Sequence, residues 1–155
     1  MQSDILRPMK YEELLKAAGC PFCPSRLKDQ ECHQVIHQTK HASLLINRAP
    51  YSKDHLLVAP VRHITNLESL TTKELNEMLA LTKTGVTLLQ KRGHTAYSIL
   101  TRQGEDSGKS VKHSHIHVIP DIIITAKENA SLQRAVQTDR QLSTLLKTYK
   151  QLLNV

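Results

Sequence analysis

The chain has 155 residues, 39% of them hydrophobic, which suits one domain around a single buried core. No apolar run approaches the roughly 18 residues of a membrane-spanning helix, and the start lacks the basic and apolar regions of a signal peptide, so we expect a cytoplasmic protein without a membrane partner. The net charge of +7 favours an anionic partner such as a nucleotide or a nucleic acid. With four Tyr, one Phe and no Trp, platforms for stacking single-stranded bases are scarce, which argues against nucleic acid.

The first part of the chain predicts a short helix, a rigid turn and three strands. Residues 11–18 form a helix candidate that Gly19 would end. In the following CPFCPSR, two prolines predict a rigid knuckle rather than a helix or strand. Alternating or continuous apolar patterns then predict strands at residues 33–38, 42–47 and 55–60.

The second part predicts a long helix, two strands and a final helix. Thr71 and Glu74 fit a capping box at the start of the long helix, and Gly93 is a fitting stop. Strands follow at 96–101 and 115–122, and an amphipathic helix is strongest from about 139 to 153. This order predicts an α+β fold, a mostly antiparallel sheet with one long helix packed on it and a C-terminal helix. The expected apolar stripe of the long helix is Leu75, Met78, Leu79, Val86 and Leu89, and that of the last helix is Leu142, Leu145, Leu146, Tyr149, Leu152 and Leu153.

Three histidines stand at alternating positions in SVKHSHIHVIPD, at 113, 115 and 117. On a strand they would share one face with Ile119. Burying three imidazoles together is costly unless each has a partner, and a neutral imidazole serves as a ligand, a base or a nucleophile. The preceding loop adds parts of a phosphate site, namely two glycines that permit close backbone approach, one hydroxyl and two cations: Gly104, Gly108, Ser110, Lys109 and Lys112.

The cysteine pair Cys20 and Cys23 is the second candidate site. Three cysteines in a chain without a secretion signal argue against a disulfide framework. Taken alone, CxxC fits a redox pair or half a zinc site, although the expected helix before it and Pro24 after it disfavour a thioredoxin-like motif. Zinc would need two more N or S ligands, for which His63 and one of the three alternating histidines are the candidates.

The stretch GKSVKHSHIHVIPD resembles the signature of the histidine triad family, His-φ-His-φ-His-φ-φ with φ apolar, although Ser114 stands at the first φ. INRAPYSKDHLLVAPVRHITNLESLTTKEL resembles the family's upstream strand-loop-strand segment, and CPFC its zinc-bearing branch. The likeness covers roughly residues 20–121 and is nearest to the fragile-histidine-triad and dinucleoside polyphosphate hydrolase branch. We therefore expect a lead-in and short helix at 1–19, a catalytic domain at 20–121 and a helical extension at 122–155 packed on that domain.

The resemblance implies a nucleotide hydrolase. It would cleave at the α-phosphate of a nucleoside phosphoramidate or dinucleoside polyphosphate, through a nucleotidyl-histidine intermediate, and release a nucleoside monophosphate. The nucleophile would be His115, with His117 on the phosphate oxygens and His55 supporting the triad. The resemblance also implies a purine nucleotide substrate, a homodimer, Mg²⁺ accompanying a polyphosphate, and a structural zinc. The implied nucleotide-binding residues are Asn47, Arg102, Gly108, Lys109, Ser110 and His117, of which Ser110 would also be catalytic, and the implied zinc ligands are Cys20, Cys23, His63 and His113.

Two positions depart from the family pattern. The family commonly has Asn or Gln where Arg102 stands and Gln where Lys109 stands. The two cations could grip a longer polyphosphate, or they could mark a weakened enzyme that binds nucleotides without turning them over. A DNA-adenylate hydrolase is a further alternative, suggested by the basic charge. The third triad position is His117 rather than the Gln that accompanies nucleotidyl transferases, which favours hydrolysis.

Overall fold

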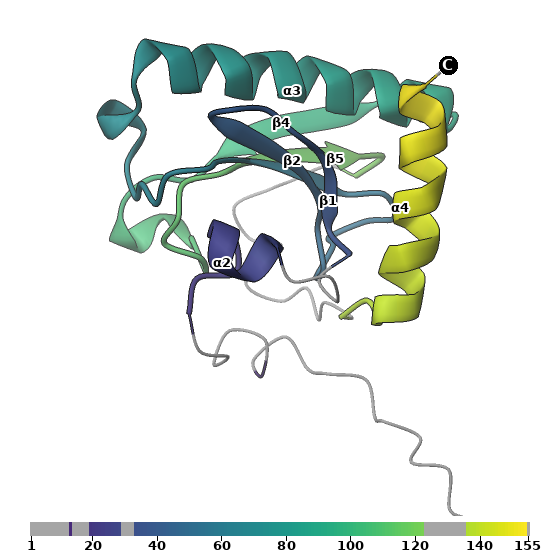
Figure 1. The fold of residues 1–155 in the computed structure, drawn as a ribbon, viewed down its shortest axis with the longest axis horizontal. Helices are drawn as coiled ribbons and strands as arrows, with labels where there is room; N and C mark the ends of the chain where they lie inside the picture. Colours follow the sequence, from purple (N-terminus) through teal and green to yellow (C-terminus); the bar gives the residue numbers. More distant parts are fainter. Residues whose placement is uncertain (1–12, 14–18, 29–32, 123–135, 155) are drawn as a thin grey trace, which may run out of the picture.

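The computed structural model describes residue 13 and residues 19–28, 33–122 and 136–154. Five strands form one sheet in the order β1-β2-β3-β5-β4, and every neighbouring pair is antiparallel (Figure 1). This confirms the predicted α+β fold, while the helix predicted at 11–18 lies almost wholly outside the described residues. The strands are β1 (Val35–Gln38), β2 (Ala42–Ile46), β3 (Leu56–Pro60), β4 (Tyr97–Thr101) and β5 (Ile116–Pro120).

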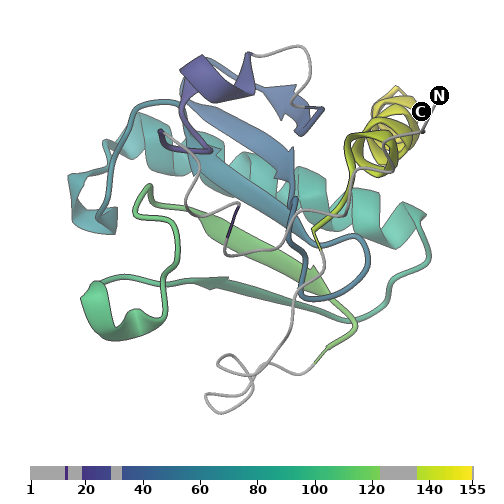
Figure 2. The ribbon, with the colours of Figure 1, turned by 90° about the horizontal axis from the view of Figure 1, so that it is seen from below.

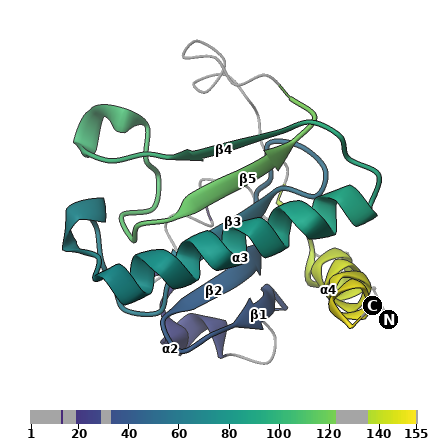
Figure 3. The same ribbon diagram turned by 90° about the horizontal axis from the view of Figure 1, so that it is seen from above.

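The long helix α3 (Thr72–Lys91) covers one face of the sheet (Figure 3). Its capping box is formed as predicted, because the side chain of Thr71 accepts from the backbone N–H of Glu74 and the Glu74 carboxylate accepts from the N–H of Thr71. Leu79, however, is 54% exposed, so its place in the predicted apolar stripe was wrong. Met78 and Leu89 of that stripe are buried as predicted, and the buried set also includes four residues that the prediction left out: Leu81, Thr82, Gly85 and Leu88.

Gly85 places the backbone of α3 directly against the sheet. A Cβ atom at this position would lie 3.3 Å from Leu44, 3.6 Å from Leu56 and 3.9 Å from Val118. These three side chains come from β2, β3 and β5 and belong to the main hydrophobic core. The absence of a side chain thus lets the helix backbone pack closely against the three central strands.

The opposite face of the sheet carries the short helix α2 (Pro24–Leu27), as Figures 1 and 2 show. The expectation that CPFCPSR contains no helix was therefore wrong by one turn, because Pro24 occupies the first helical turn, where its missing N–H leaves no bond unmade. Phe22 packs there with Leu45, Leu57 and Ala59 in a second, smaller apolar cluster. This face holds the candidate site.

The C-terminal helix α4 (Asp139–Leu153) packs beside β1 and α3 (Figure 3). Thr138 and Gln141 form a second capping box, and Leu142 and Tyr149 are fully buried in the main core. Leu145, Leu146, Leu152 and Leu153 pack against that core, which confirms the predicted apolar face. No helix in the described part of the chain is long and apolar enough to cross a membrane.

A partly buried polar cluster joins the loop before β3, the end of α3 and the end of β5. Asp54 forms an ion pair with Arg92 at 2.8 Å and with His94 at 2.8 Å, and the second ring nitrogen of His94 contacts Asp121. The guanidinium of Arg92 also lies 5.1 Å from the ring centre of Tyr149 on α4. The cluster therefore ties α4 to the residue that precedes His55.

Candidate active site and metal centre

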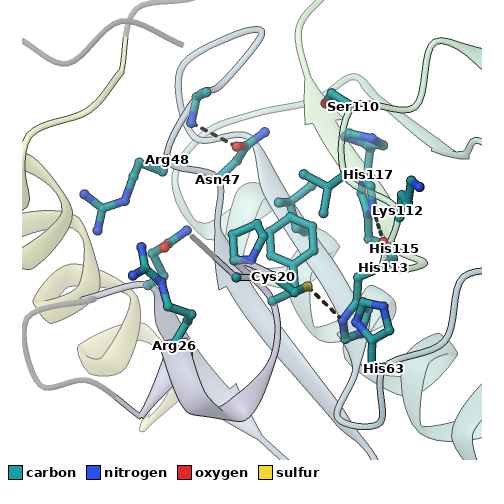
Figure 4. A pocket seen from close by; sticks show the side chains of 17 residues that line it. Cys20, Arg26, Asn47, Arg48, His63, Ser110, Lys112, His113, His115 and His117 are labelled. Atoms are coloured by element: carbon teal, nitrogen blue, oxygen red, sulfur yellow. Dashed lines mark hydrogen bonds between the residues drawn. The ribbon is translucent and has the colours of Figure 1, made fainter. Parts of the chain in front are cut away.

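The three alternating histidines line one cavity on the α2 side of the sheet (Figure 4). The cavity has a volume of about 310 Å³, and His113, His115 and His117 are all nearly buried. β5 spans Ile116–Pro120, so only His117 lies in the strand, and the strand predicted at 115–122 was too long by one residue at its start and two at its end. The approach to β5 is held by a hydrogen bond from the N–H of Ser114 to the carbonyl of Ile64. The three imidazoles nevertheless reach the same cavity.

His113 presents one ring nitrogen to the cysteine pair. Its Nε2 lies 2.8 Å from the carbonyl oxygen of Pro60, and because a carbonyl only accepts, we assign the proton to Nε2. Nδ1 is then a lone pair, 3.3 Å from Sγ of Cys20 and 3.6 Å from Sγ of Cys23. Burial lowers the pKa of His113 to about 4, so the imidazole stays neutral at physiological pH and is suited to hold a metal ion.

His115 is held in the opposite tautomer to that of His113. Its Nδ1 lies 2.8 Å from the carbonyl oxygen of His113, so Nδ1 carries the proton and Nε2 carries the lone pair. Burial lowers the pKa of His115, and the nearby cations Lys109 and Arg102 lower it further. The imidazole is therefore neutral at physiological pH, and a neutral imidazole with an open Nε2 can act as a nucleophile.

A chain of hydrogen bonds determines which ring nitrogen of His117 carries the proton. The N–H of Tyr51 and the side-chain amide of Asn47 both donate to Nδ1 of His55, each at 3.1 Å. His55 must then carry its proton on Nε2, which lies 3.0 Å from Nδ1 of His117. His117 in turn carries its proton on Nε2 and offers a hydrogen-bond donor to the cavity. His55 is 1% exposed, and Tyr51 stacks on its ring at 5.2 Å.

Four donor atoms from three distant segments form a possible metal site. One ligand atom each of Cys20, Cys23, His63 and His113 lies within 4.8 Å of the other three, and Nδ1 of His63 is 3.2 Å from Sγ of Cys23. Sulfur and nitrogen ligands of a tetrahedral zinc are separated by about 3.5 Å, given Zn–S and Zn–N bonds of about 2.3 and 2.0–2.1 Å. The observed separations of 3.2, 3.3 and 3.6 Å and the Cys₂His₂ donor set therefore fit zinc.

The thiol of Cys23 would ionise at neutral pH only with a cation beside it. Burial and the neighbouring Cys20 raise the pKa of Cys23 to about 11, so the thiolate is disfavoured in the protein alone. A bound metal ion would reverse this balance, because it stabilises deprotonated sulfur. The cluster also borders the triad, since Phe22, between the two cysteines, packs edge-on against the ring of His115 with centroids 5.1 Å apart.

The residues expected to bind the nucleotide divide into two groups. Asn47, Ser110 and His117 line the cavity, whereas Gly108, Lys109 and Arg102 are not among its lining residues. Nζ of Lys109 donates to the carbonyl of Thr65 at 2.6 Å, and a guanidinium nitrogen of Arg102 would lie 3.0 Å from a Cβ atom at Gly108. Gly108 itself adopts a left-handed conformation, with φ of 73°.

Sequence reasoning missed two cations of the same cavity, Arg26 on α2 and Arg48 after β2. Arg48 also donates to the carboxylate of Asp139 on α4 at 2.9 Å. Arg48 lies within the INRAPYSKDH segment and Arg26 follows CPFC, but no pattern in these stretches marks either side chain as part of a site. Only the fold brings α2 and the residue after β2 to one cavity. Phe22 and Gln34, which also line it, were missed for the same reason.

A profile of the HIT domain matches residues 28–122. The chain belongs to the HIT domain family. It is 32% identical over 88 residues to the bis(5′-nucleosyl)-tetraphosphatase [asymmetrical] of Schizosaccharomyces pombe, with 56% of this chain and 48% of that protein aligned. It is 29% identical over 102 residues to the adenosine 5′-monophosphoramidase hnt1 of the same organism, covering 66% of this chain and 74% of the relative.

Solved structures agree with the family assignment. The crystal structure of the Caenorhabditis elegans NitFhit protein matches with a TM-score of 0.66 and 25% identity, over 78% of this chain and 27% of that one. A Zn-bound histidine triad family protein from Mycobacterium smegmatis has a TM-score of 0.66 at 19% identity, over 88% of this chain and 96% of that one, which shows the shared fold. In sequence, the chain spans 24% of NitFhit and 48% of the tetraphosphatase.

Proposed function

We propose that this HIT domain protein is a nucleotide hydrolase that acts at the α-phosphate of a nucleoside phosphoramidate or a dinucleoside polyphosphate. The observation that carries the proposal is that His115 and His117 reach one cavity in opposite tautomers. His115 keeps an unprotonated Nε2 because its Nδ1 bonds to the carbonyl of His113, and His117 keeps a protonated Nε2 because His55 donates to its Nδ1. A nucleophile thus stands beside a hydrogen-bond donor, with ring centres 4.7 Å apart. The relatives named as nucleotide hydrolases support the same class of reaction.

The proposed reaction has two steps. Nε2 of His115 forms a bond to the α-phosphorus while the P–N or P–O bond to the leaving group breaks, and the leaving group departs with that bond's electron pair and takes up a proton. Water then attacks the phosphorus, the bond to Nε2 breaks, and a nucleoside monophosphate is released. His117 donates to the phosphoryl oxygens, where negative charge develops, and Ser110 and Lys112 line the same cavity. Burial lowers the pKa of His115 below its ordinary 6.5, which keeps the nucleophile unprotonated at neutral pH.

We further propose that Cys20, Cys23, His63 and His113 hold a structural zinc ion. Four protein ligands leave no open position for substrate, so the ion would fix His113, whose carbonyl orients His115. About one zinc per chain is expected in the purified protein. The Cys20→Ser/Cys23→Ser double variant should lose the metal, and zinc retained at full occupancy in that variant would contradict the assignment.

A homodimer built on β4 is the proposed assembly. β4 is an edge strand, and Tyr97 and Ile99 on it are 39% and 51% exposed. An edge strand with exposed apolar side chains is suited to pair with another copy. Leu79 on α3 is exposed as well.

A turnover screen tests the function and separates its substrates. Adenosine and guanosine phosphoramidates and dinucleoside tri- and tetraphosphates would be incubated with the protein, with and without Mg²⁺. Release of a nucleoside monophosphate is expected, and His115→Ala should abolish it without loss of fold. Binding of nucleoside monophosphates without turnover of any substrate would leave a nucleotide-binding protein rather than an enzyme.

A further inference from the structure

The cavity that holds the triad also contains two arginines that the proposed reaction does not use. Arg26 and Arg48 both line it, and in Figure 4 they lie on the side away from Ser110 and His117. The wall of the cavity is otherwise largely apolar, formed by Pro21, Phe22, Ala49, Leu57 and Val111. The cavity therefore combines the triad with two guanidinium groups across an apolar wall.

The size of the cavity limits which ligand can lie between the triad and the two arginines. A volume of about 310 Å³ is near the lower end of small-ligand sites, which run from about 300 to 1,000 Å³, and suits a single nucleotide. If the α-phosphate lies at the triad, as in the proposed function on which this step rests, the base extends along the apolar wall. Its polar edge then meets the arginines.

We propose that Arg26 and Arg48 recognise the edge of the base and select one that presents hydrogen-bond acceptors. Guanine and hypoxanthine offer two acceptors there, O6 and N7, and a guanidinium binds this pair with two donors. Adenine instead offers a donor, its N6 amine, next to N7, so a guanidinium faces a donor and loses one bond. The chain should accordingly prefer 6-oxopurine nucleotides to adenine nucleotides.

The surroundings of Arg48 favour a neutral acceptor over a second phosphate group. Its guanidinium donates to the carboxylate of Asp139 at 2.9 Å, which already supplies a counter-charge. Its backbone carbonyl accepts from the N–H of Gln137 at 2.8 Å, so the residue is held by the segment that leads into α4. With 18% of its side chain exposed, Arg48 is preorganised, whereas Arg26 is exposed and stands at the rim.

Calorimetric titration of the whole protein with GMP, IMP and AMP tests the proposal. GMP and IMP should bind about tenfold more tightly than AMP, the low end of what a two-donor arginine contact contributes. Arg48→Met and Arg26→Met should each weaken GMP and IMP binding and leave the affinity for AMP unchanged. Arg140→Met is the matched control, because it removes a cation from α4 that does not line this cavity, and it should leave the preference intact.

The outcomes separate the two proposals. Equal affinity for the three nucleotides would overturn the base selection while nucleotide binding at the triad stands. Tight GMP binding with IMP as weak as AMP would show that the 2-amine is recognised, and would also overturn the role given to the arginines. No binding of any of the three would contradict the proposed function itself. If Arg48→Met fails to fold, Arg26→Met alone decides. An unchanged preference for GMP and IMP over AMP in Arg26→Met would show that Arg26 does not recognise the base, and would overturn the proposal.

Discussion

Replacing Asp54 with asparagine should lower the free energy of unfolding by about 3 kcal/mol, because it leaves the buried guanidinium of Arg92 without its counter-charge. The Asp54 side chain is 2% exposed and that of Arg92 is 17% exposed, so water replaces little of the lost interaction. Asparagine is the informative replacement because Asp54 has φ of 68°, a left-handed conformation that asparagine tolerates and alanine does not. The measured loss then reports the charge rather than backbone strain.

Urea denaturation at pH 6 of the wild type, Asp54→Asn, Arg92→Met and the double variant would measure the effect. The double variant has no unpaired charge at this position. Its loss in free energy of unfolding should therefore be clearly smaller than the sum of the losses in the two single variants. A loss below about 1 kcal/mol for Asp54→Asn would refute the reasoning, because it would mean that Arg92 finds water or another partner at little cost.

The same cluster predicts how stability depends on pH. Burial alone would raise the pKa of Asp54, but Arg92 and His94 outweigh it and lower that pKa below the ordinary 3.8. Its contribution is therefore present above 3.8 and lost as the pH falls through the lowered value. Burial would lower the pKa of His94, yet Asp54 and Asp121 raise it above 6.5, so this contribution is complete below 6.5 and lost as the pH rises through the raised value. The cluster should stabilise the protein most between these two limits, and Asp54→Asn should flatten the profile.

Three further predictions concern other parts of the molecule. His55→Ala should reduce kcat by about 10- to 100-fold with little change in KM, since His55 orients His117 without touching substrate; an equal rise in KM would instead indicate a binding role. Gly85→Leu should lower the free energy of unfolding by about 1–3 kcal/mol through overpacking, whereas Gly85→Ala should stay within about 1 kcal/mol, because better helix propensity offsets its 3.3 Å contact with Leu44. Ile99→Lys should give a monomer in light scattering, and an unchanged dimer would place the interface elsewhere.

Local signals predicted much of the fold, and the failures arise where packing decides. The capping box at Thr71 is set by neighbouring residues, so the sequence contained all that was needed. The apolar pattern of α3 predicted a buried face but not which row of side chains meets the sheet. Leu79 is exposed and Gly85 is buried, and Gly85 faces Leu44, Leu56 and Val118 on three different strands, which the local sequence does not reveal.

The candidate site shows the same limit. Family resemblance predicted the set Cys20, Cys23, His63 and His113, which the fold brings together across 93 residues of sequence separation. The tautomers of the histidines could not be predicted, since they depend on carbonyl groups such as that of Pro60. Net charge likewise does not reveal which cations reach a cavity, so Lys109, which bonds to a backbone carbonyl, was expected there and Arg48 was not.

The central claim is that His115 forms a covalent bond to the substrate phosphorus. Protein mixed briefly with substrate and quenched in base, which preserves phosphorus–nitrogen bonds of histidine, can be digested and analysed by mass spectrometry. A nucleotidyl group on the peptide that contains His115, absent from His115→Ala, is the expected result. Turnover at close to the wild-type rate by His115→Ala, or a nucleotidyl group found only on another residue, would contradict the account.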